Sequence, residues 1–310
     1  MTGSSHQTVL LHEAVDALIV DPRGYYVDGT FGRGGHSQLI LSRLSTAGRL
    51  LGIDKDPQAI TEARKLYESD KRFDIEHGSF AGLADVVTTR QMEGRVDGVL
   101  LDLGVSSPQL DQAERGFSFL RDGPLDMRMD TRSGTTAAEW VNTAAEAQIA
   151  WVLKVYGEER FAKRIAAAIV YERQKVAIER TQQLAEIVAA ANPAWEKSKH
   201  PATRAFQAIR IHINNELGDL EAVLDQALTV LKVGGRLVVI SFHSLEDRVV
   251  KRFIRRHERG DELPPGVPVI DAALNKRLRS LRKAIRATGF EVSDNIRSRS
   301  AIMRVAEKIK

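Results

Sequence analysis

Short apolar runs alternate with longer amphipathic segments through the first hundred residues of the chain. The runs lie at 25–27, 50–53 and 96–101, a shorter strand-like stretch lies at 73–77, and a further run follows at 237–242. Continuous apolar runs of this length are typical of buried parallel strands, and the segments between them have the apolar spacing of covering helices. The pattern therefore predicts an α/β protein with a Rossmann-like, mostly parallel sheet.

This alternation stops in the middle of the chain. Residues 111–135 look like loop, and helical segments are predicted at 136–153, 158–175 and 181–191. We therefore expect an inserted helical domain at 111–199 and a discontinuous main domain formed by 1–110 and 200–310. Basic residues on the inserted helices would form either a plain solvated cap or a face that helps to hold a substrate.

A single long helix is predicted from His200 onward. Apolar residues at helical spacing from Phe206 to Leu224 would form its core face. A separate stripe carries Arg204, Gln207, Arg210 and Asn214. Because it contains no acidic residue, this stripe is either solvent-exposed surface or the wall of a polar cleft.

Local capping signals predict where two other helices begin. Asp56 followed by Pro57 is typical of an N-cap and a first helical residue. Ser244, with Asp247 three residues later, predicts a second helix start. Toward the C-terminus, 281–292 and 300–305 are interpreted as an antiparallel edge hairpin.

Composition narrows the class of protein. The chain has 310 residues, 43% of them hydrophobic and 28% charged, which is typical of a globular protein. The absence of cysteine excludes disulfides, thiolate metal sites and cysteine nucleophiles, and no metal-ligand set is predicted. No apolar run approaches the ~18 residues of a membrane span, and no signal-peptide core is found. We expect a cytoplasmic protein that does not associate with membranes.

The charge is unevenly distributed. From Arg248 to Lys310 the chain carries 17 basic and 7 acidic residues, whereas the remainder carries 28 and 34. Such a segment is either solvated surface or the binding surface for a polyanion such as a nucleic acid.

A glycine-rich stretch follows the first predicted strand. That strand ends on Asp28, and glycines occupy positions 29, 32, 34 and 35 before a helix begins. The spacing does not fit the G-x-G-x-x-G pattern of dinucleotide-binding loops. S-adenosylmethionine requires the same close approach to bare backbone. Asp54 ends the next predicted strand, where a carboxylate can hold ribose hydroxyls.

A second candidate site follows the strand at 96–101. That strand ends at Asp102, and ligands of open α/β sheets bind at the carboxyl ends of strands. The loop after it contains Ser106, Ser107 and Pro108 and is tight and polar. We expect this loop and Asp102 to hold one substrate atom in place.

Together these blocks resemble a known family. The matching segments are 26–36, 102–110, 115–119, 122–130, 200–210, 241–251 and 295–304. They are similar to the bacterial small-subunit (16S) ribosomal RNA cytosine-N4 methyltransferases. The resemblance departs at Asn295-Ile296-Arg297, where the family usually has Asn-Pro-Arg, so the rigid turn that proline would impose is not predicted here.

The resemblance implies a class I S-adenosylmethionine-dependent methyltransferase with a helical insertion that helps to hold RNA. The target would be a cytosine in the decoding centre of 16S ribosomal RNA, in the small subunit or a late assembly intermediate. The residues implied to contact the donor are Gly34, Gly35, His36, Asp54, Phe80, Asp102 and Gln109. Phe80 would lie against the adenine, although the sequence is equally compatible with an ordinary packing aromatic.

Cytosine chemistry suggests the second set of roles. The exocyclic amine is a poor nucleophile because its lone pair is delocalised into the ring, so an acceptor on its N–H must orient it. Catalytic roles are therefore predicted for Asp102, Ser106, Ser107 and Pro108. No covalent nucleophile is required, and positioning supplies much of the acceleration.

Three alternatives remain open from the sequence. A nicotinamide-dependent oxidoreductase would share the fold, but the glycine spacing disfavours it. A non-catalytic RNA-binding assembly factor would share the basic C-terminal segment, but it would not need a glycine loop and two strand-end carboxylates. A DNA or RNA amino-methyltransferase with another target is the nearest alternative. The oligomeric state is not predicted.

Overall fold

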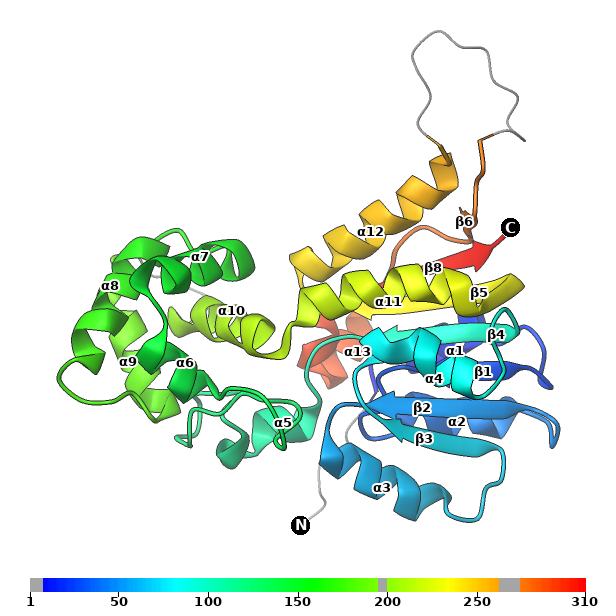
Figure 1. Cartoon of the computed structure of the whole chain (residues 1–310), viewed down its shortest axis with the longest axis horizontal. Coiled ribbons are helices and arrows are strands. Elements are labelled where there is room, and N and C mark those ends of the chain that lie inside the picture. The colour runs from blue at the N-terminus through cyan, green and yellow to red at the C-terminus, as the bar shows by residue number, and fades with distance from the viewer. Residues whose placement is uncertain (1–7, 195–199, 262–273) are drawn as a thin grey trace, which may run out of the picture. The chain divides into compact units, whose positions relative to one another are not determined.

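The computed structural model describes residues 8–194, 200–261 and 274–310. The chain forms two compact units, one made of Met1–Gly104 with Leu217–Lys310 and the other of Val105–Glu216 (Figure 1). The second unit is longer at both ends than the helical segment expected at 111–199. On the C-terminal side, apolar residues of 202–209 join the helical core.

The first unit contains a single sheet with the strand order β3-β2-β1-β4-β5-β8-β6, and β7 pairs with β8. Strands β1 to β5 run parallel, and β8 is antiparallel to β5. The predicted mostly parallel sheet is confirmed. The strands are β1 (Tyr25–Asp28), β2 (Arg49–Asp54), β3 (Phe73–His77), β4 (Val96–Asp102), β5 (Leu231–Ser241), β6 (Leu278–Ser280), β7 (Ile285–Arg286) and β8 (Ile302–Lys308).

Both faces of this sheet are buried. In β4, Val99 and Leu101 belong to one hydrophobic cluster and Leu100 to another. Alternate residues of a strand point to opposite faces, so the two clusters lie on the two sides of the sheet. One side is covered by α1 (Leu11–Leu18) and α2 (Gly35–Arg43). The other is covered by α4 (Leu83–Thr89), α11 (Glu216–Val230) and α12 (Ser244–Arg259).

Two local predictions at helix starts had different outcomes. Helix α3 (Pro57–Tyr67) begins as predicted, and the Asp56 side chain accepts a hydrogen bond from Gln58 N at 2.9 Å. The predicted Ser244 cap is wrong: His243 is the N-cap of α12, and Glu246 is its reciprocal partner. Asp247 instead forms an ion pair with Arg304 of β8 at 2.7 Å.

The predicted C-terminal hairpin is partly wrong. Strand β8 is antiparallel to β5 but lies inside the sheet, between β5 and β6. Much of 281–292 forms the short β7 and then α13 (Gly289–Asp294). After α13 the chain turns through a 3₁₀ helix, Ile296–Ser300, capped by Asn295, whose side chain accepts from Arg297 N at 3.1 Å. The chain therefore makes a turn at this position without the proline that the family usually has.

The second unit is helical. Its core joins apolar residues from α6, α7, α8, α9 and α10. Helix α9 has the predicted bounds, the predicted helix at 158–175 begins at Ala162, and the predicted helix at 136–153 is two helices separated by extended backbone at Ala144 and Ala145. The elements are α5 (Ser107–Asp111), η2 (Ala113–Arg115), α6 (Ala137–Thr143), α7 (Glu146–Gly157), α8 (Ala162–Arg173), α9 (Thr181–Ala191) and α10 (Ala202–Asn214).

The single helix predicted from His200 is also two helices. Asn215 adopts the left-handed conformation with φ 51°, which ends α10 and separates it from α11. Phe206 packs in the helical core, whereas Leu224 packs against the sheet. The continuous apolar stripe therefore serves two different cores, which is why its helical spacing did not reveal the break.

The polar stripe of α10 is fully engaged inside the second unit. Arg204 Nη1 donates to the Glu158 carbonyl at 3.2 Å, and Arg210 forms a two-point ion pair with Glu216 at 2.7 and 2.8 Å. Asn214 donates to the Met127 carbonyl at 2.8 Å. The stripe thus anchors the ends of other elements.

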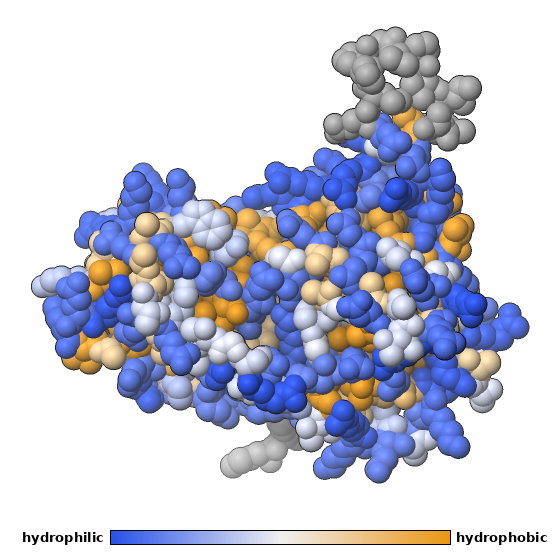
Figure 2. Space-filling view, viewed as in Figure 1, coloured by the Kyte–Doolittle hydropathy of each residue, from blue (hydrophilic) through white to orange (hydrophobic). Residues whose placement is uncertain are grey.

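Within the described part of the chain, no helix is both long and apolar enough to cross a membrane. Hydrophilic residues dominate the face drawn in Figure 2, and apolar residues appear there singly or in small groups.

Candidate methyl-donor site

Three carboxylates end three neighbouring strands of the first unit. Asp28, Asp54 and Asp102 are the last residues of β1, β2 and β4, and these strands are adjacent in the order β2-β1-β4. Parallel strands have their carboxyl ends on the same side of the sheet, so all three acids gather there. The carboxyl ends of these strands form the candidate site.

Asp28 accepts hydrogen bonds from both ends of the glycine loop. Its side chain is 1% exposed, and it accepts a hydrogen bond from Ser37 Oγ at 2.7 Å and from Thr30 N at 3.2 Å. Burial raises the pKa of this carboxyl. Because its oxygens face the chain itself, Asp28 holds the loop and the start of α2 together.

Asp54 ties the glycine loop to the next strand. Gly32 N donates to its Oδ2 at 2.7 Å, and Asp56 N donates to its Oδ1 at 2.8 Å. Burial raises its pKa to about 6. Each carboxylate oxygen can accept more than one hydrogen bond, so ribose hydroxyls can still be bound.

The loop between β1 and α2 depends on small residues. Gly34 is the N-cap of α2 in the left-handed conformation, with φ 74°. A Cβ on Gly35 would lie 1.9 Å from Thr8 Oγ1, and a Cβ on Gly34 would lie 2.7 Å from Phe31 Cζ. Thr8 and Phe31 thus occupy the space that a Cβ would need, so both positions require glycine.

His36 and Asp102 meet beside this loop. Nδ1 of His36 lies 3.6 Å from Oδ2 of Asp102, and the imidazole is 4% exposed. Burial lowers the pKa of His36 to about 4 and, reinforced by the charges of Asp28 and Glu246, raises the pKa of Asp102 well above its usual value. Among the described residues, Asp102 Oδ1 and His36 Nε2 are buried without a hydrogen-bond partner.

Phe80 lies near the same loop. A Cβ on Gly29 would be 3.4 Å from Phe80 Cβ, and the ring packs partly against the sheet core. Just before it, Ser79 Oγ donates to Asp219 Oδ2 at 2.6 Å, and Lys55 forms an ion pair with the same carboxylate. Asp219 thus links the ends of β2 and β3 to the start of α11, which the sequence did not indicate.

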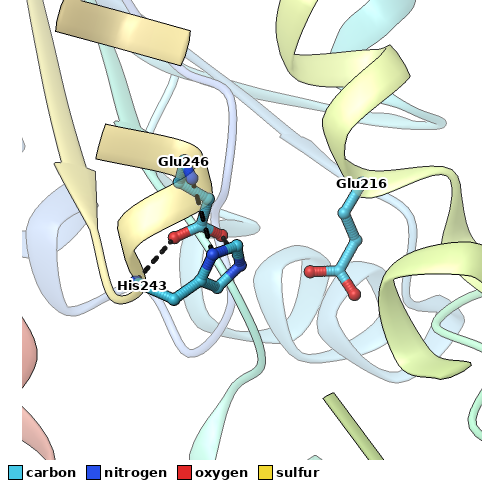
Figure 3. A group of neighbouring side chains, drawn as sticks. All are labelled: Glu216, His243 and Glu246. Atoms are coloured by element: carbon cyan, nitrogen blue, oxygen red, sulfur yellow. Dashed lines mark hydrogen bonds and ion pairs between the residues drawn. The ribbon is translucent and has the colours of Figure 1, made fainter. Parts of the chain in front are cut away.

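A second group that the sequence missed lies at the end of β5 and just after it. Ser241 Oγ is buried and has no partner within the described residues, and Ile240 of β5 pairs with Asp102 in register. Glu246 folds back on the loop, where its Oε2 accepts from Phe242 N at 2.8 Å and its Oε1 lies 3.1 Å from His243 Nε2 (Figure 3). The signal available in the sequence was a glutamate three residues after His243, the spacing of a capping box.

The remaining expected residues belong to the second unit. Ser106 begins four residues after Asp102 and caps α5, in which Pro108 is an early residue. Ser106 N donates to Gln109 Oε1 at 3.0 Å, and the Gln109 side chain is 5% exposed. Ser107 is also buried. These four residues form one rigid turn.

The geometry of the first unit fits S-adenosylmethionine. The glycine loop offers backbone without side chains, Asp54 offers acceptors, and the orphaned Asp102 Oδ1 and His36 Nε2 mark buried polar atoms that a ligand would satisfy. Gly34, Gly35, His36, Asp54 and Phe80 gather around one sheet edge. The site contains no phosphate-binding glycine pattern.

A mostly parallel sheet of this order, with a glycine loop and acids at adjacent strand ends, is that of a class I S-adenosylmethionine-dependent methyltransferase. The model of the MraW methylase family matches residues 3–309, and the chain belongs to that family. The match confirms the resemblance seen in the sequence. The family is one of methylases, and S-adenosylmethionine is accordingly the methyl donor.

Solved structures that match this chain have low sequence identity to it. An rRNA-methylase from Clostridium thermocellum is 13% identical with a TM-score of 0.45, and the alignment covers 98% of both chains. A methyltransferase from Streptococcus mutans in complex with SAH is 12% identical with a TM-score of 0.39, covering 96% of this chain and 93% of that one. NSun6 from Pyrococcus horikoshii is 14% identical with a TM-score of 0.43, covering 96% and 51%.

Proposed function

We propose that this protein methylates the exocyclic N4 of a cytosine in the decoding centre of 16S ribosomal RNA. The observation that carries the proposal is the Asp102 carboxylate at the end of β4, which has a buried oxygen without a partner among the described residues. S-adenosylmethionine supplies an electrophilic methyl group when bound, and it needs no covalent intermediate on the protein.

Asp102 has the properties that an amine-orienting group requires. The N4 amine gains a carbon in the reaction and must lose a proton. Burial raises the pKa of Asp102, which makes its carboxylate a stronger proton acceptor. Oδ1 accepts the hydrogen bond from the N4 amine and then its proton, while His36 beside Oδ2 limits the movement of the carboxylate.

The donor-binding roles follow from the same edge of the sheet. Gly34 and Gly35 present backbone to the methionine part of the donor, Asp54 accepts from the ribose hydroxyls, and Phe80 lies against the adenine. His36, Asp102 and Gln109 complete the contacts. Ser106, Ser107 and Pro108 form the rigid turn that positions the cytosine.

Positive charge supports RNA as the polyanion. On α12, Arg252 and Arg255 are exposed and make no ion pair in the described part of the chain. The helical unit also exposes Arg160, Lys163 and Arg164. The target base must leave its stack at a cost of a few kcal/mol, which is smaller in a partly assembled RNA. The proposed substrate is therefore the small subunit or a late assembly intermediate, which places the reaction in the cytoplasm.

The test is methyl transfer from labelled S-adenosylmethionine to unmodified small subunits, to naked 16S RNA and to cytosine-containing DNA. The RNA is then digested, and the nucleosides are identified by mass spectrometry. The proposal predicts N4-methylcytidine at one position in subunits, formed about a hundredfold or more slowly by the Asp102→Asn variant. Methyl groups on another base, or on DNA alone, would contradict the proposed target. Donor binding without any methyl transfer would favour a non-catalytic assembly factor.

A further inference from the structure

A second concave region lies at the amino ends of the strands of the first unit. It is a hollow of about 480 Å³ lined by residues that precede or begin β1, β2, β3 and β4. The candidate methyl-donor site lies at the carboxyl ends of these strands, so the hollow is separate from it and has no role in the proposed chemistry.

Basic residues mark the start of each of these four strands. Arg72 immediately precedes β3, Arg49 opens β2, Arg23 lies two residues before β1, and Arg95 immediately precedes β4. The strands are neighbours in the order β3-β2-β1-β4, with a spacing of ~4.8 Å between adjacent strands. The sheet therefore arranges separate basic residues into one row, to which Lys71 adds a further charge.

The acidic residues in the hollow are already neutralised. Asp97 Oδ2 accepts from Tyr25 N at 2.8 Å, and its other oxygen forms an ion pair with Lys232. Asp74 forms an ion pair with Arg90 at 2.7 Å. Within the row, Arg23 and Arg72 pair with Asp21 and Asp70. The positive charge that no ion pair compensates within the described residues is therefore that of Arg49, Lys71 and Arg95.

Some of the cations are structural and others are available. Arg72 donates to the carbonyl oxygens of Leu41 and Leu44, each at 2.9 Å, and to Asp70. Arg49 Nη1 donates to the carbonyls of Thr46 and Gly48, which holds the guanidinium in place. The other N–H groups of this guanidinium can still donate to a ligand. Lys71 and Arg95 are exposed and have no ion-pair partner within 8–194, 200–261 and 274–310.

The hollow also has an apolar wall. Tyr25, Leu50, Phe73 and Met92 line it, so it combines flat and flexible apolar groups with guanidinium donors. Guanidinium groups bind phosphate with well-defined geometry, and aromatic rings stack on bases.

We propose that this hollow binds a nucleotide, with the phosphate on Arg49, Lys71 and Arg95 and the base against the apolar wall. The ligand is either a free nucleoside phosphate or one nucleotide of an RNA strand. Only the RNA source rests on the proposed function; binding of a free nucleotide does not.

The experiment compares two variants with equal loss of charge. One carries Arg49→Gln, Lys71→Gln and Arg95→Gln. The control carries Arg43→Gln, Arg64→Gln and Lys65→Gln, which remove cations of the same unit that lie outside the hollow and outside the basic segment 248–310. Cytidine monophosphate binding is measured by calorimetry. Binding of a labelled single-stranded RNA is measured by fluorescence anisotropy over a range of salt concentrations, and circular dichroism checks that both variants are folded.

We expect the hollow variant to lose at least about tenfold in affinity for one of the two probes, while the control matches the wild type. Weaker binding of cytidine monophosphate identifies a free nucleotide as sufficient. A change with RNA alone, with the salt slope falling by ~0.7 for each lost phosphate contact, identifies RNA as the source. Equal behaviour of the two variants with both probes overturns the proposal. Donor affinity, which neither variant should alter, keeps this outcome separate from a failure of the proposed methyl transfer.

Discussion

His36 Nδ1 lies 3.6 Å from Asp102 Oδ2, and each of these ionisable groups is perturbed by the burial of the site. Burial disfavours the charged form of both, lowering the pKa of His36 and raising that of Asp102. The same low-polarity surroundings that would strengthen a hydrogen bond to a substrate amine thus cost the free protein stability.

The first prediction concerns the pH dependence of folding. The pKa of His36 is about 4 in the folded protein and 6.5 by default, so between these values the unfolded chain binds the extra proton. Its contribution to the free energy of unfolding is complete above pH 6.5 and is lost as the pH falls toward 4, by up to about 3 kcal/mol. Asp54, whose pKa is raised to about 6, contributes a slope of the opposite sign.

Comparison with a variant isolates the histidine. We expect His36→Gln to show less loss of urea-unfolding free energy between pH 7 and pH 4.5 than the wild type. His12→Gln, which changes an exposed histidine on α1, serves as the control. Parallel pH profiles for His36→Gln and the wild type would mean that His36 is not buried in its neutral form.

The second prediction concerns catalysis at Asp102. Asp102→Asn keeps the shape and removes the charge and the basicity of the side chain. Single-turnover methyl transfer at saturating donor should fall by about a hundredfold or more, as for the loss of a preorganised polar group at a transition state. RNA affinity should stay the same. Recovery of the wild-type rate at saturating donor would instead assign Asp102 to donor binding.

The third prediction concerns donor affinity at Asp54. Asp54→Ala removes a charge-assisted acceptor worth ~1.5–3 kcal/mol, so calorimetry should show donor binding weakened by about one to two decades. The variant also loses the hydrogen bonds from Gly32 N and Asp56 N, so the loop itself loosens. Asp74→Ala, at the other edge of the sheet, is the control. Equal donor affinity in both variants would remove Asp54 from the site.

The fourth prediction concerns packing in the helical unit. A Cβ on Gly157 would lie 2.8 Å from the Arg204 carbonyl oxygen and 3.2 Å from Ala208 Cβ. Gly157→Ala should therefore lower the free energy of unfolding by about 1–3 kcal/mol, despite the better helix propensity of alanine. Gly289→Ala is the matched control, because its Cβ would meet nothing within 4 Å. Urea titration of both variants tests this, and equal stabilities would show that α7 and α10 can separate without cost.

Features that depend on neighbouring residues in the chain could be predicted from the sequence. Asp28, Asp54 and Asp102 were placed at strand ends because short apolar runs identify buried strands and the acids end those runs. Asp56 was identified as a cap because its side chain bonds a backbone N–H only two residues away. The glycine spacing already favoured S-adenosylmethionine over a dinucleotide, and the family resemblance added the class of substrate.

Tertiary structure decided what depends on distant partners. The break at Asn215 rests on one left-handed residue, and an apolar stripe looks the same whether it serves one core or two. His243, and not Ser244, caps α12 because Glu246 folds back on the loop after β5. Asp247 forms its ion pair with Arg304, which lies 57 residues later in the chain. The row of arginines at the start of four strands arises only when strands that are separated in sequence pair side by side. Local sequence cannot specify such pairing, because its energy comes from burial and hydrogen bonds between segments that meet only in the folded chain.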